Sequence, residues 1–62
     1  MTKNEIILNT LNSFNEQRAR LNRELENVNY NESNYSFKVS DLNFQISQID
    51  FKISELINTL ND

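Results

Sequence analysis

The sequence predicts an all-α protein: a helical hairpin, or a long antiparallel coiled coil, that associates with itself in the manner of a four-helix bundle. Three observations lead to this fold class. Apolar residues recur at alternating steps of four and three along most of the chain, glycine and proline are both absent, and the chain is only 62 residues long. Such a repeat is typical of a left-handed coiled coil, and glycine and proline are the residues that most weaken a helix.

The heptad begins at Ile7, which we assign to position d, and continues in one frame to Leu60. Two polar residues, Arg18 and Glu32, occupy positions that are otherwise apolar. Polar residues at such positions can set the register or the number of chains in a coiled coil. The predicted seam consists of Ile7, Leu11, Phe14, Leu21, Leu25, Val28, Tyr35, Val39, Leu42, Ile46, Ile49, Ile53, Leu56 and Leu60.

One loop is expected in the middle of the chain, which we predict to be a single domain over residues 1–62. Segment 29–36 is rich in asparagine and serine. The side chains of these residues compete for backbone hydrogen bonds and favour turns. We therefore expect a helix over about residues 4–28, a loop over about 29–34 and a second helix over about 34–61.

Folding the chain at this loop brings the apolar residues of the two helices together in a consistent register. Leu21 then meets Leu42, and Phe14 meets Ile49. An unbent helix that pairs with a second copy in the antiparallel sense makes the same contacts between chains. The heptad therefore leaves the hairpin and the straight antiparallel coiled coil both open.

A second fold is compatible with residues 35–53, namely a helix followed by a three-stranded β-meander. This segment contains three five-residue runs in which apolar and polar residues alternate, as in half-buried strands. Its two-residue connections, Ser-Asp and Ser-Gln, are poor hairpin turns because they lack the glycine that such turns favour. The heptad that continues to Leu60 favours the helix.

A second apolar stripe is confined to the predicted second helix. Phe37, Phe44 and Phe51 fall at position f, outside the seam, and Tyr30 continues the same spacing back into the loop. A serine follows each phenylalanine after three residues, and its small side chain permits close approach. Large exposed apolar patches on a small protein mark interaction surfaces. We expect another protein surface to cover these four residues, either a second copy or a different protein.

Arg18, Arg20 and Arg23 form the only basic cluster. On a helix they occupy positions a, c and f, and Glu16 lies four residues before Arg20, a spacing typical of ordinary surface pairs. The three arginines are candidates for electrostatic contact with an acidic partner or with RNA, as in a small RNA-binding four-helix bundle. The net charge of −3 opposes this alternative, because binding to phosphates needs clustered cations. We therefore do not expect a nucleic acid as the partner.

The composition excludes several classes of chemistry. Histidine, cysteine and glycine are all absent, so the usual ligands of zinc, iron–sulfur clusters and haem are missing, as are thiol nucleophiles and phosphate-binding glycine loops. We expect no enzyme activity, no cofactor and no metal site. The sequence contains no long apolar segment and no secretory signal pattern, so we expect a cytoplasmic protein without a membrane partner.

These points predict a non-enzymatic protein–protein interaction module that also associates with itself. Asparagine accounts for 12 of the 62 residues, and this bias is typical of AT-rich genes. A small phage or mobile-element protein from a low-GC host fits that bias, and it would inhibit or adapt a partner protein in the host cytoplasm. The alternative is a structural or assembly subunit in which the phenylalanines lie inside a homo-oligomeric coiled coil.

Overall fold

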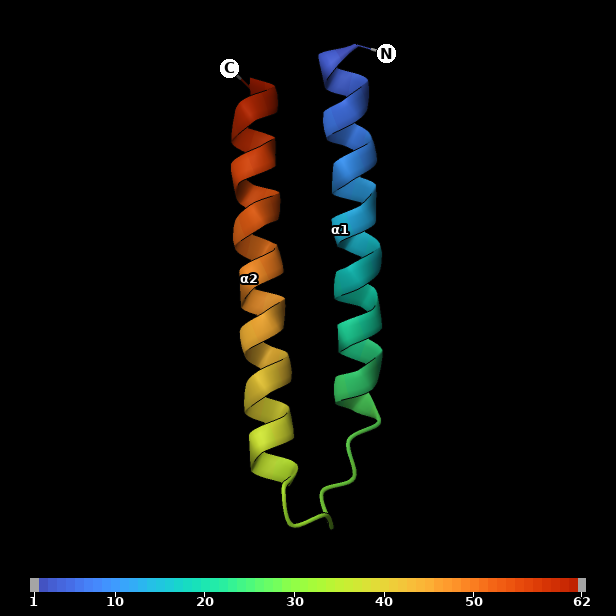
Figure 1. The fold of residues 1–62 in the computed structure, drawn as a ribbon, viewed down its shortest axis with the longest axis vertical. Helices are drawn as coiled ribbons and strands as arrows, with labels where there is room; N and C mark the ends of the chain where they lie inside the picture. Colours follow the sequence, from blue (N-terminus) through green and yellow to red (C-terminus); the bar gives the residue numbers. More distant parts are fainter. Residues whose placement is uncertain (1, 62) are drawn as a thin grey trace.

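The computed structural model describes residues 2–61, and the side chains of residues 2–60. Helix α1 spans Lys3–Glu26 and helix α2 spans Tyr35–Asn61, and the chain reverses direction between them (Figure 1). The two helices lie side by side and antiparallel, with both ends of the chain at the same end of the hairpin. The molecule is long and thin, with extents of 48 × 16 × 11 Å.

The hairpin confirms the all-α prediction and decides between its two forms. The straight helix is wrong for this chain, because residues 27–34 leave the helical path. The β-meander is also wrong, since α2 continues through all three of the proposed strands. As a helix, this segment keeps its heptad residues against α1, whereas strands would have required two turns that the sequence does not favour.

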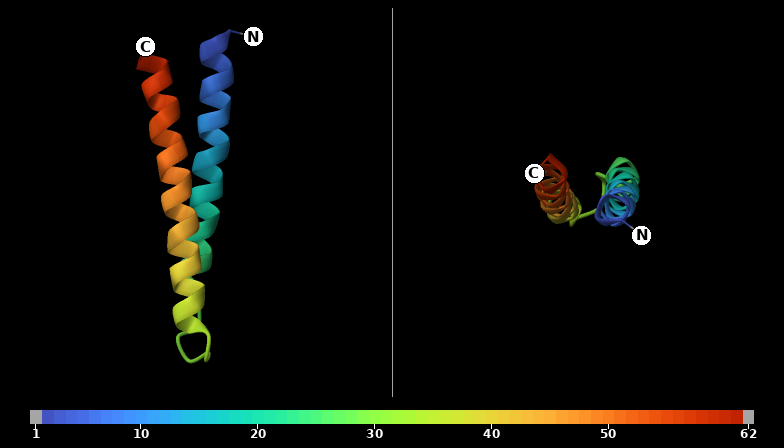
Figure 2. Two further views of the ribbon diagram at one scale, coloured as in Figure 1. Left: turned by 60° about the vertical axis from the view of Figure 1, so that its left-hand side comes forward. Right: turned by 90° about the horizontal axis from the view of Figure 1, so that it is seen from above.

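The seam predicted from the heptad is the core of the hairpin. Its apolar residues are buried or half-buried, apart from Tyr35, which is 36% exposed at the loop end. Ile7, Leu42 and Ile49 are the most buried, with 8% of their surface exposed. Seen from above, the two helices stand in a single layer (Figure 2). Each helix therefore has one packing partner, and the face turned away from it is open to solvent.

Helix α1 begins with a side-chain cap. The hydroxyl oxygen of Thr2 accepts a hydrogen bond of 3.2 Å from the backbone N–H of Glu5. This bond satisfies a backbone donor that has no partner within the helix, and the acidic side chain of Glu5 is favourable near the positive end of the helix dipole. The start of α1 is therefore encoded locally by these two residues.

The end of α1 comes two residues before the predicted boundary. The backbone N–H of Asn27 donates to the carbonyls of Arg23 and Glu24, both at 3.1 Å. Val28 then donates to the carbonyl of Leu25 at 3.3 Å, which tightens the last turn. Val28 nevertheless stays half-buried, so the seam extends past the end of the helix itself.

The loop turns through asparagine side chains and an ion pair. The Asn29 side-chain oxygen accepts a hydrogen bond of 2.9 Å from the backbone N–H of Asn31, as expected of an asparagine turn. Glu32 pairs with Lys38 in the first turns of α2, at 2.6 Å between Oε2 and Nζ. Within residues 2–61 no residue has a positive φ angle. The reversal is therefore made without the left-handed conformation that asparagine tolerates.

We predict that truncation of the seam is costly and that truncation outside it is not. Leu42→Ala should lower the free energy of unfolding by about 2–3 kcal/mol, because it leaves a cavity between the helices. Leu8→Ala, a change at a side chain that is 50% exposed, should cost less than about 1 kcal/mol. Urea unfolding followed by circular dichroism at a fixed protein concentration measures both. Equal losses would contradict the assignment of the seam.

Candidate functional site

The outer face of α2 carries the largest exposed apolar side chains. Phe37, Phe44 and Phe51 are 81%, 62% and 65% exposed. The heptad explains their common direction, because residues seven apart return to the same side of a helix after two turns. Position f lies opposite the a and d positions, so the three rings point away from α1. We call this surface, together with the serines between the rings, the Phe face.

Small side chains separate the three rings. Ser40, Ser47 and Ser54 occupy position b and are exposed. Each lies three residues after a phenylalanine and four before the next position f, so rings and serines alternate along one face of the helix. The Phe face is therefore a row of ridges and gaps with a regular spacing.

Tyr30 lies outside this row. It belongs to the loop, is 76% exposed, and its ring meets the ring of Tyr35 edge to face, with 6.3 Å between centroids and an interplanar angle of 84°. Such a contact stabilises aromatic pairs beyond simple burial. The helical spacing that linked Tyr30 to the phenylalanines in the sequence does not continue into the loop, and its partner is the seam residue at the start of α2.

The basic cluster is divided between two environments. Arg18 extends toward α2, where its Nη1 lies 2.8 Å from Oδ1 of Asp50. Its Nη2 also donates to the side-chain oxygen of Asn15 at 3.1 Å. Arg20 and Arg23 are exposed on α1. The structure therefore does not bring the three arginines together, and one of them already holds an acidic partner within the hairpin.

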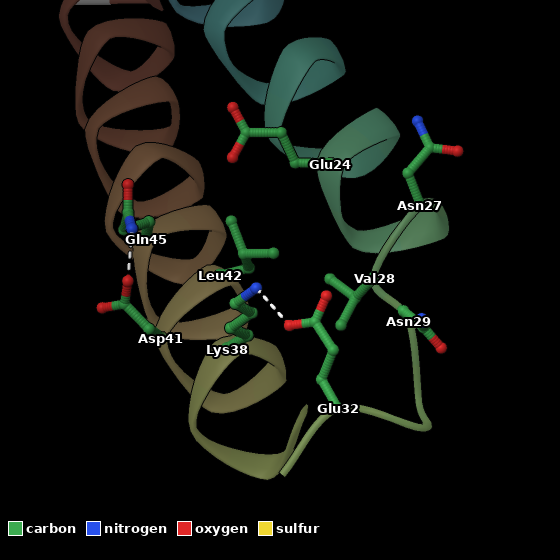
Figure 3. Close-up of a pocket in the computed structure, with 9 residues that line it drawn as sticks. All are labelled: Glu24, Asn27, Val28, Asn29, Glu32, Lys38, Asp41, Leu42 and Gln45. Carbon is green, nitrogen blue, oxygen red and sulfur yellow. Dashed lines mark hydrogen bonds and ion pairs between the residues drawn. The ribbon is translucent and has the colours of Figure 1, made fainter. Parts of the chain in front are cut away.

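One flank of the hairpin is hollowed along its length. Among the described residues, shallow hollows lie between the helices, and the one next to the loop has a volume of about 380 Å³ (Figure 3). Position g residues of both helices line three of these hollows, among them Glu24 and Lys38 at the loop end and Thr10 and Lys52 at the open end. In Figure 3, Val28 and Leu42 lie between the two helices, with Lys38 reaching toward Glu32 beside them.

These hollows and three further exposed residues were missed by the sequence analysis. Ile6, Leu8 and Ile57 are 53%, 50% and 43% exposed. Lys52 also lies over the ring of Phe14, with its Nζ 5.9 Å from the ring centroid. The heptad contained a signal for two of these exposed residues. Leu8 and Ile57 occupy position e near the open end, and position e borders the seam.

The part of the chain that the structure describes contains no group of three or more side chains suited to hold a metal ion. Among the same residues, neither helix is apolar enough over a sufficient length to cross a membrane. The protein is thus an antiparallel two-helix hairpin with one apolar outer face. No protein family, curated protein or solved structure matches the chain.

The contact between Arg18 and Asp50 yields a measurable coupling. In a double-mutant cycle with Arg18→Ala and Asp50→Ala, we expect a coupling free energy of about 0.2–1 kcal/mol, because both side chains remain partly exposed to water. The coupling should shrink as salt is added. A parallel cycle with Arg20→Ala and Asp50→Ala should show none. Equal coupling in the two cycles would contradict the specific pairing.

Proposed function

We propose that the protein is a non-enzymatic protein-interaction module that acts by stoichiometric binding of another protein surface against the Phe face. One observation carries the proposal: Phe37, Phe44 and Phe51 are each more than 60% exposed and lie on the same side of one helix. Phenylalanine gains about 1.5–3 kcal/mol when it is fully buried. Three such rings in a row therefore supply a large driving force for association.

The shape of the Phe face favours a helical partner. The stretch from Phe37 to Phe51 covers four turns, or about 21 Å, and its side chains point outward from a straight helix. Amphipathic helices bind by laying an apolar face along such a surface, with anchors spaced by three, four and seven residues. In this arrangement α2 is the middle of three helices, with α1 on one side and the partner on the other.

Polar residues beside the rings define the rim of the proposed interface. Asp41 and Glu55 border the row of phenylalanines at position c, while the serines border it on the other side. Central apolar anchors with a polar rim are the usual anatomy of protein interfaces. The two edges of the Phe face therefore differ in charge, which restricts how a partner can be oriented on it. The acidic edge suits basic or amide side chains on the partner.

We further propose that the module modulates its partner, as an inhibitor or an adaptor encoded by a phage or mobile element. The support for this setting is the compositional bias of the sequence. The second candidate is a structural or assembly subunit. The regular alternation of rings and serines favours it, because a repeated surface of this kind is suited to packing against a surface with the same repeat.

The proposed function predicts that association depends on the Phe face. The combined variant Phe37→Ser, Phe44→Ser and Phe51→Ser should keep the helical circular dichroism signal, because position f makes no contact in the hairpin seam. The amount of protein bound to this variant should be at least tenfold lower than the amount bound to the unchanged chain. Two measurements check this: the mass of the purified chain by light scattering, and the amount of each protein that co-purifies with the tagged chain from cell extract.

The matched control changes the same heptad position on α1, where Asn9, Glu16 and Arg23 are replaced by serine. This variant has the same number of serine substitutions at exposed sites but removes no apolar ring, so its association should equal that of the unchanged chain. If the phenylalanine variant folds and still binds the same proteins in the same amounts, the proposal is wrong.

A further inference from the structure

The outer face of α2 has the pattern of a second coiled-coil seam. Along this face the residues follow steps of three and four, as positions a and d do in a heptad. The row runs Phe37, Ser40, Phe44, Ser47, Phe51, Ser54. The first of the two alternating positions always holds phenylalanine and the second always holds serine. Contact with an arbitrary apolar surface would not require such a strict alternation of large and small side chains.

We propose that the occupant of the Phe face is the same face of a second copy, with the two α2 helices antiparallel. This inference rests on the second candidate for the proposed function, the structural or assembly subunit, and names the partner of the Phe face. A two-fold axis between Gln45 and Ile46 sets each ring against a serine in one register. The facing pairs are Phe37 with Ser54 of the second copy, Phe44 with Ser47 of the second copy, and Phe51 with Ser40 of the second copy.

Size complementarity supports the antiparallel arrangement. Well-packed cores alternate large and small residues across facing positions. In the antiparallel pairing every layer contains one phenylalanine and one serine, so all layers have the same width. A parallel pairing in register stacks rings on rings and serines on serines, which makes wide and narrow layers alternate and leaves gaps at the serines.

The charges beside the rings favour the same arrangement. In the antiparallel pairing two of the three flanking carboxylates face an amide: Asp41 faces Gln48 of the second copy, and Asp50, which also pairs with Arg18, faces Asn43 of the second copy. The parallel pairing instead sets Asp50 against Glu55 of the second copy, once on each side of the interface. Like charges in such flanking positions are repulsive.

The size of the hairpin core supports a second copy as well. Only three residues among those described are buried by the hairpin alone, Ile7, Leu42 and Ile49. Domains of this size rarely form a sufficient core without a staple or association. A fully buried phenylalanine removes about 150–250 Å² from water, so six rings that are 62–81% exposed can contribute roughly 600–1,000 Å². With the serines and the flanking polar side chains added, this area is comparable to the roughly 1,000 Å² expected of a specific interface.

The predicted dimer is a flat layer rather than a compact bundle. The Phe face lies opposite the seam with α1, so the second copy adds its α2 on the far side. The order across the layer is then α1, α2, α2 of the second copy and α1 of the second copy. The self-association expected from the sequence thus has a different geometry from the four-helix bundle proposed there.

Single cysteine variants test both the contact and its direction, because the natural chain has no cysteine. In the antiparallel register, residue 47 of one copy lies about 4.5 Å along the axis from residue 47 of the other. The corresponding offsets are about 16.5 Å for residue 40 and about 25.5 Å for residue 54. Disulfides cannot form when the two Cα atoms are more than about 7 Å apart.

We expect Ser47→Cys to form a disulfide-linked dimer in air at least five times as abundantly as Ser40→Cys or Ser54→Cys, on non-reducing gels. The matched control is Ser13→Cys, an exposed serine on α1, which should give only background cross-linking. Serine-to-cysteine changes at exposed sites are mild, so the helical signal should stay unchanged. Adding Phe44→Ser to Ser47→Cys should reduce cross-linking toward the control.

Two results would overturn the inference. Equal cross-linking at residues 40, 47 and 54 indicates a parallel dimer, in which each residue lies opposite its own copy. Cross-linking of Ser47→Cys no greater than that of Ser13→Cys excludes the second copy as the occupant. In that case the triple phenylalanine variant separates the two proposals. If a different protein co-purifies with the unchanged chain but not with this variant, the proposed function holds and only the second copy is excluded. If the variant loses no bound protein, both the proposed function and this inference are wrong.

Discussion

The packing of α1 against α2 along one heptad seam is the interaction on which the rest of the structure depends. The seam holds the only buried side chains among the described residues, and it aligns the helices so that the g positions of both border one flank and the e positions the other. It also determines what stays uncovered. A helix has one face toward its partner, and in a two-helix hairpin nothing covers the opposite face.

The two helices differ in what they place on that opposite face. In α1 the residues at position f are Asn9, Glu16 and Arg23, all of which are polar. In α2 the same position holds Phe37, Phe44 and Phe51. Exposed aromatic rings are unfavourable in water, so the outer face of α2, unlike that of α1, supports the proposal of a further neighbour. This asymmetry between the two helices is the observation from which the proposed function is argued.

Much of the fold was predictable because it depends on local spacing. The apolar residues of the heptad seam are, apart from Tyr35, buried or half-buried in the structure, and the asparagine-rich segment is where the chain turns. The meander failed because strand-like alternation over 35–53 is also compatible with a helix when the same residues fit a longer heptad. The short-range pattern was ambiguous, and the longer period decided between the two.

The candidate site was predictable in part. Phe37, Phe44 and Phe51 were identified from their period alone, since a helix carries that period directly into a common direction. Tyr30 was expected in the loop but was assigned to the same stripe. The structure instead places its ring against that of Tyr35, because helical spacing does not determine direction outside the helix. The hollows along the flank depend on both helices at once and had no clear signature in either.

By itself, the sequence determined the helical period, the residues of the seam and the direction of the Phe face, because all three follow from spacing along a helix. Only the tertiary structure decided that the chain bends back on itself, that Arg18 meets Asp50 across the hairpin, and that Tyr30 packs on Tyr35. These features join residues separated by a turn or by a whole helix. Their distances depend on how two elements meet in space, which no local pattern encodes.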